Sequence, residues 1–66
     1  MKKYFKTELI ENFIKAKGWS ISKFCKECKI SVRVYGKIIN QQLNFRITGL
    51  FKIARVMKVY VRELCY

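Results

Sequence analysis

Residues 20–40 read "SISKFCKECKISVRVYGKIIN" and contain two serines that can begin helices. Ser20 can cap a helix over about 21–28, and Ser31 can cap another over about 32–40. Within both segments the apolar residues are spaced three and four positions apart, which is the period of a helix with one buried side. The stretch therefore predicts two short helices joined by a tight turn.

The second of these predicted helices has two chemically different sides. At about 100° per residue, one half of the helix is apolar and bulky: Val34, Tyr35, Ile38 and Ile39. The other half is small or polar and carries two cations: Val32, Arg33, Gly36, Lys37 and Asn40. We expect this helix to keep its apolar side in a core and to present a slim basic side to the surface.

Apolar spacing predicts a helix on each side of this pair. Over about 7–17 the apolar stripe consists of Leu9, Ile10, Phe13 and Ile14, with Thr7 as N-cap and Gly18 after the last turn. Over about 49–57 the inward set consists of Leu50, Phe51, Ile53, Ala54 and Met57, with Thr48 as N-cap.

A short fifth helix is predicted near 61–65, and residues 41–46 read as a loop. Proline is absent and the three glycines stand apart, which favours helices over a turn-rich β-protein. We expect one all-α domain over residues 1–66, a compact bundle of about five short helices with a helix-turn-helix at about 20–40.

The charge balance restricts the class of partner. Fifteen Lys and Arg face four acidic residues, a formal net charge of +11, so an anionic partner is favoured. A membrane-surface helix would show one long apolar face, whereas here several short segments share the apolar residues. The chain has no run of about 18 apolar residues, and charges interrupt its basic opening, so neither a membrane span nor a signal peptide is expected. This favours nucleic acid and a cytoplasmic location.

Cys25 and Cys28 have the spacing of half a zinc site. The chain has no histidine and one further cysteine, Cys65, so a four-ligand site would need a carboxylate. We expect the pair to be small core residues on the inner side of the first predicted helix, with no metal or other cofactor. With no histidine, carboxylate pair or phosphate loop, enzymatic activity is not expected.

Residues 18–40 resemble the helix-turn-helix of the phage-repressor-like (Cro/cI, lambda-repressor-like, XRE-type) DNA-binding domains. The matching positions are Trp19, Ser20, Phe24, Cys25, Cys28, Ile30, Ser31, Tyr35 and Ile38. Downstream, "LFKIARVMKVYVREL" (residues 50–64) resembles the last two helices of these domains. The resemblance implies a cytoplasmic regulator that binds double-stranded DNA.

The same resemblance assigns candidate contacts. The family positions that reach base edges fall on Val32, Arg33 and Lys37, and Gly36 lets the helix lie close to the bases. The positions and loop residues assigned to the DNA backbone are Ser20, Ser31, Asn40, Gln42, Asn44 and Arg46. Arg33 can bind guanine O6 and N7 with two hydrogen bonds, and Val32 can touch a thymine methyl group.

The chain departs from the family pattern at four positions. Lys29, Gln41 and Lys58 stand where glycine is common, and a left-handed backbone there costs a non-glycine residue about 1 kcal/mol or more. Ile21 replaces a glutamine that holds a phosphate, so that contact is not carried over.

The leading hypothesis is a sequence-specific transcriptional regulator, a repressor of phage, plasmid or mobile-element type. Two alternatives stay open: an antitoxin or controller subunit of a two-gene module, and a protein-interaction module with a degenerate DNA surface. The apolar C-terminal stretch, with Tyr60 and Tyr66 to spare, favours pairing of two copies. Because a +11 chain repels its copy, we expect this pairing on DNA.

Overall fold

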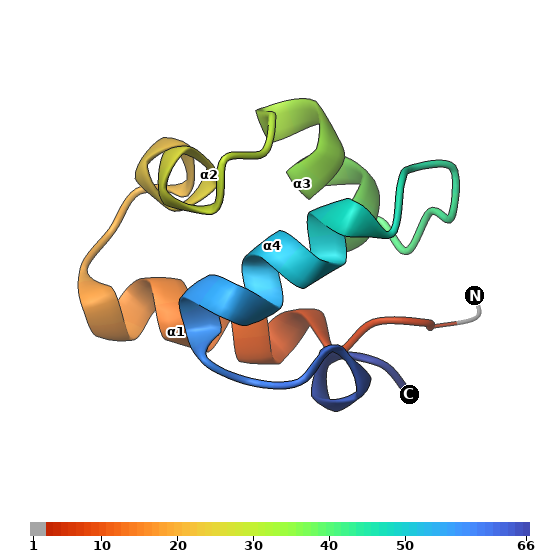
Figure 1. Cartoon of the computed structure of the whole chain (residues 1–66). Helices are drawn as coiled ribbons and strands as arrows, with labels where there is room; N and C mark the ends of the chain where they lie inside the picture. Colours follow the sequence, from red (N-terminus) through yellow and green to blue (C-terminus); the bar gives the residue numbers. More distant parts are fainter. Residues whose placement is uncertain (1–2) are drawn as a thin grey trace.

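The computed structural model describes residues 3–66, and within them the fold is all-α (Figure 1). Its elements are α1 (Thr7–Lys17), α2 (Ile21–Cys28), α3 (Val32–Ile39), α4 (Thr48–Met57) and the 3-10 helix η1 (Val61–Leu64). The predicted fifth helix is wrong in kind, because the chain makes a single 3-10 turn there. Within residues 3–66, none of the helices could span a lipid bilayer.

Helix α4 lies at the centre of the molecule. In Figure 1 it runs between α2 and α3 on one side and α1 on the other. It packs against α2 and η1, and α1 packs against η1 as well. Helices α2 and α3 therefore lie on one side of α4, and the remaining elements pack together to hold α4 in place.

The core draws at least one side chain from every element. The largest fully buried side chains are Phe24, Ile10, Ile38, Leu50, Ile53 and Leu64. The ring of Phe24 contacts Phe13 and Tyr35 edge-on, with centroid distances of 6.0 and 5.9 Å. Phe24 thus joins α2 to both α1 and α3.

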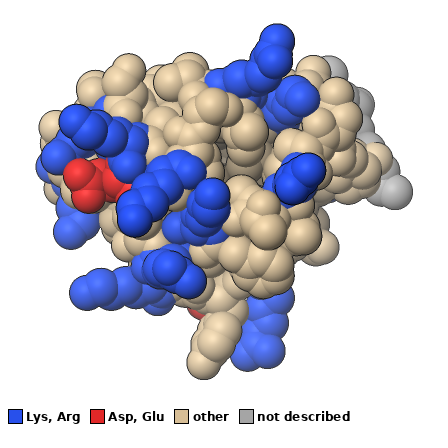
Figure 2. Space-filling view, turned by 45° about the horizontal axis from the view of Figure 1, so that its top comes forward, with Lys and Arg blue, Asp and Glu red and all other residues tan. Residues whose placement is uncertain are grey.

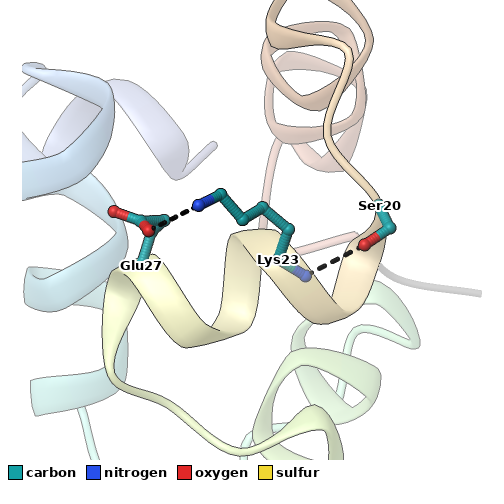
Figure 3. Close-up of polar contacts among 3 residues, drawn as sticks. All are labelled: Ser20, Lys23 and Glu27. Atoms are coloured by element: carbon teal, nitrogen blue, oxygen red, sulfur yellow. Dashed lines mark hydrogen bonds and ion pairs between the residues drawn. The ribbon is translucent and has the colours of Figure 1, made fainter.

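Both predicted serine caps are confirmed. The Ser20 Oγ accepts a hydrogen bond from the Lys23 N–H, and the Ser31 Oγ accepts one from the Val34 N–H, each at 3.1 Å. Figure 3 shows the first of these contacts, together with the exposed Lys23–Glu27 ion pair at 3.0 Å. The caps fix where α2 and α3 begin, because each satisfies an N–H that has no partner within the helix.

The two predicted threonine caps are wrong. Thr7 and Thr48 are the first residues inside their helices, and neither helix has a side-chain cap. Before α4, Ile47 is already helical (φ −58°, ψ −22°), so Thr48 lies in the first turn. Before α1, the Lys6 N–H donates to the Leu64 carbonyl at 2.7 Å, and this pairing with the C-terminal segment sets the helix start.

Two residues predicted to face the core lie on the surface. Leu9 and Phe51 are 41% and 56% exposed. On α4, Leu50, Ile53 and Ala54 are buried and already fill the inward arc. A core formed by so short a chain cannot cover the residues at the edge of each apolar stripe.

The chain uses left-handed backbone at the positions where the resemblance indicated glycine. Lys29, Gln41 and Lys58 have φ values of 58°, 61° and 58°, and Gly18 has 67°. Lys29 and Lys58 are the C-caps of α2 and α4. A left-handed backbone at a C-cap favours glycine, so a lysine at either position is strained.

We expect Lys58→Gly and Lys29→Gly each to raise the free energy of unfolding by up to about 1 kcal/mol. Glycine has no Cβ and therefore removes the backbone strain of the folded state. This stabilisation exceeds the destabilisation that comes from the greater conformational entropy of the unfolded chain. Urea unfolding of the single variants measures both effects. A loss of stability in both would contradict the strain assigned to these caps.

Candidate nucleic-acid interface

At the start of α3 the outward side is exposed as predicted. Val32 is 55% exposed, and Arg33 is exposed beside it. Tyr35 and Ile38 are buried behind them and anchor the helix in the core. A Cβ added at Gly36 would meet nothing within 4 Å, so the helix is slim there and faces open space.

Lys37 is placed differently from the other predicted base-reading residues. Its Nζ donates a hydrogen bond to the Asn44 carbonyl at 3.0 Å, and the side chain is half-buried. The ammonium group therefore bends toward the loop that follows α3. Sequence spacing had placed it beside Arg33 and Gly36 on the outward side.

The residues predicted to hold the DNA backbone divide into two groups. Asn40, Gln42, Asn44 and Arg46 are exposed and follow one another at the end of α3 and in the next loop. Ser20 and Ser31 lie instead at the N-termini of α2 and α3, where their hydroxyl groups cap the helices. Their hydroxyl hydrogens stay available as donors.

A cationic hollow of about 270 Å³ opens where the turn between α2 and α3 meets the start of α4. Its lining includes four cations, Lys29, Lys37, Arg46 and Lys52, and two hydroxyl groups, Ser31 and Thr48. No Asp or Glu is among the described residues that line it. The hollow is therefore suited to an anion.

Sequence reasoning did not find Lys29 and Lys52 as candidate contacts. The Lys52 Nζ donates to the Lys29 carbonyl at 3.4 Å, which joins α4 to the turn between α2 and α3. A second hollow contains both residues, together with Arg55 and the acidic Glu27. In Figure 2, Lys and Arg side chains gather over the face that carries α2 and α3, where acidic groups are sparse.

Gly49 is a further residue that sequence reasoning missed. It is buried, and a Cβ added there would lie 3.1 Å from the Val34 Cγ1. The first turn of α4 can therefore approach α3 closely, which fixes one wall of the cationic hollow. A glycine one position after a threonine carries no visible sign of such a contact.

The cysteine pair lies in the core, as predicted. Cys25 and Cys28 are 3% and 2% exposed on the inner side of α2. Burial, with smaller effects from Cys25 and Glu27, raises the pKa of the Cys28 thiol to about 12. Among residues 3–66 no group of three His, Cys, Asp or Glu side chains is placed to hold a metal ion.

We expect the protein to lose stability as the pH rises above about 9. The pKa of Cys28 is about 12 when folded against an ordinary value of 9.0, so the neutral thiol is favoured by folding. Its stabilising effect is complete below pH 9 and is lost between the two values. Urea unfolding at pH 8 and pH 10.5 measures the effect. Between these two pH values the free energy of unfolding should fall less in Cys28→Ala than in the native chain. Equal losses would contradict this role of the thiol.

The family model described as Helix-turn-helix matches residues 10–64, from α1 to the end of η1. No curated protein and no solved structure matches the chain.

Proposed function

We propose that the chain, which belongs to the phage-repressor-like helix-turn-helix family, is a sequence-specific transcriptional regulator that places α3 in the DNA major groove. The observation that carries the proposal is the two-sided build of α3. Its back is buried through Tyr35 and Ile38, and its front is exposed and slim. The major groove is about 12 Å wide and admits one helix of this kind.

The residues on the front of α3 would contact the bases in different ways. Arg33 supplies two parallel N–H donors for guanine O6 and N7. Val32, which precedes it, offers an apolar contact for a thymine methyl group. Gly36 follows one turn later and lets the helix lie close to the base edges.

The flanking groups support phosphate contacts on both sides of α3. Asn40 and the loop residues Gln42, Asn44 and Arg46 would bind one backbone segment, together with Lys29 and Lys52 of the hollow. Ser20 and Ser31 would donate their hydroxyl hydrogens nearby. Such contacts fix the register of a protein on DNA without reading the sequence.

We propose further that two copies bind a palindromic site and repress transcription by occupying it. A single reading helix covers too few base pairs for selectivity against a genome. Tyr60 and Tyr66 are each 68% exposed, and their rings lie under Arg62 and Lys6 at 4.8 and 5.6 Å. These rings offer contact area that a second copy can share. A net charge of +11 per chain opposes pairing until phosphates neutralise it.

Binding to duplex DNA is expected to weaken steeply with salt. If two copies contact about 6–10 phosphates, log K should fall with log[salt] at a slope of about −5 to −9. Fluorescence anisotropy of a labelled duplex over a range of salt concentrations measures this slope. A flat salt response would contradict a phosphate-based interface.

A further inference from the structure

Gln41 holds the N-terminal segment with its side-chain amide. Its Oε1 accepts hydrogen bonds from the N–H groups of Tyr4 and Phe5, both at 2.8 Å, and its Nε2 donates to the Phe5 carbonyl at 2.9 Å. All three bonds are partly buried. They connect residues 36 and 37 positions apart in the sequence. We call these three hydrogen bonds the Gln41 clamp.

The clamp is anchored in the rest of the fold. Phe5 is 5% exposed and forms an antiparallel bridge with Cys65. The Tyr66 N–H donates to the Tyr4 carbonyl at 3.1 Å. The segment that Gln41 holds is therefore itself fixed to the C-terminal end of the chain.

Gln41 is also the first residue of the loop that carries the proposed backbone contacts. The loop has further attachments. The Gln42 N–H donates to the Lys37 carbonyl at 2.8 Å, the Asn44 carbonyl accepts from the Lys37 Nζ, and the Arg46 carbonyl accepts from the Gly49 N–H at 3.0 Å. The Phe45 ring lies 5.7 Å from the Phe5 ring. Both the Gln41 hydrogen bonds and the Phe45 ring contact thus depend on the segment at Tyr4 and Phe5. A loop held in this way loses less freedom when it binds a phosphate.

We propose that Gln41 is a positioning residue that orders loop residues 42–46 through Tyr4 and Phe5 and so presents Arg46 and its neighbours to the DNA backbone. The left-handed backbone at this position favours glycine, and glutamine is strained there. Lys29 and Lys58 share that strain without a comparable side-chain clamp. The DNA consequence rests on the proposed function, whereas the ordering of the loop does not.

The ordering of the loop can be measured in the free protein. Gln41→Gly relieves the backbone, and Gln41→Asn keeps an amide that is one methylene too short to reach. In both variants we expect the Tyr4 and Phe5 amides to exchange about tenfold faster or more. The order parameters of residues 42–46 should fall toward those of a flexible loop, about 0.6. Lys58→Gly, which changes the backbone in the same way elsewhere, should leave these values unchanged.

The DNA consequence can be measured with a double-mutant cycle on a duplex selected from a random library. Arg46→Ala should weaken binding about fivefold in the native chain and less than about twofold in Gln41→Gly, because the loop is already misplaced. Arg33→Ala lies on α3 and not in the loop, so its effect should be the same in both backgrounds.

Each outcome decides the proposal. Coupling between Gln41 and Arg46, together with a disordered loop, supports it. Additive effects, or a loop that keeps its order in both Gln41 variants, overturn it. If the native chain binds no duplex, the proposed function fails, and the exchange and order parameters alone decide whether Gln41 positions the loop.

Discussion

Replacing Phe24 by alanine is expected to unfold most of the protein at 25 °C. The ring is completely buried and contacts Phe13 and Tyr35, so its removal leaves a cavity between three helices. Phenylalanine-to-alanine changes in cores cost about 3–5 kcal/mol. In a domain of 66 residues a single core rarely supplies more than about 3–5 kcal/mol of stability. Circular dichroism during thermal and urea unfolding measures the loss.

Phe51→Ala is the matched control. This ring is 56% exposed on α4, and its removal should change the free energy of unfolding by less than about 0.5 kcal/mol. Similar losses in the two variants would mean that the core is not centred on Phe24.

The second large effect is expected at Arg33. Arg33→Ala should cost about 1–3 kcal/mol per half-site, a loss of roughly 5- to 150-fold, because alanine cannot form the paired hydrogen bonds to guanine. Affinity for duplexes of unrelated sequence should fall much less, since only one charge per chain is lost. Titration of a selected duplex and an unrelated duplex at the same salt concentration separates the two effects.

Two control variants distinguish base reading from charge. Arg33→Lys keeps the charge and loses the fork of donors, so it should behave nearly like alanine on the selected duplex. Lys15→Ala removes one exposed charge from α1, on the far side of α4 from the α2–α3 pair (Figure 1), and should have little effect. An equal loss on all sequences in Arg33→Ala would assign this residue to the backbone instead.

The features that could be predicted from the sequence are those that depend on residues close together in the chain. Ser20 and Ser31 cap their helices because the bond closes over three residues, and such a bond can be read from the sequence. The two sides of α3 follow from helical period alone. The buried cysteine pair followed from the same period, together with the lack of further zinc ligands.

The remaining features depend on contacts between distant segments. Thr7 is not a cap because Lys6 pairs with Leu64, and no local pattern reveals that pairing. Lys37 bends toward Asn44, and Gln41 reaches Tyr4 and Phe5, because the fold brings those backbone groups near.

The candidate site shows the same limit. The exposed front of α3 could be placed from sequence, but the cationic hollow could not. That hollow depends on how closely the start of α4 approaches α3, which Gly49 and Val34 determine. Lys52 therefore joins the candidate interface only in three dimensions.

The most direct test of the central claim is selection of bound sites from randomised duplex DNA, performed with the native chain and with Arg33→Ala. We expect the native chain to enrich a palindrome whose half-sites are centred about 34 Å apart, each with a guanine that the variant no longer selects. Failure to enrich any sequence, or enrichment of the same sequences by both proteins, would contradict DNA reading by α3.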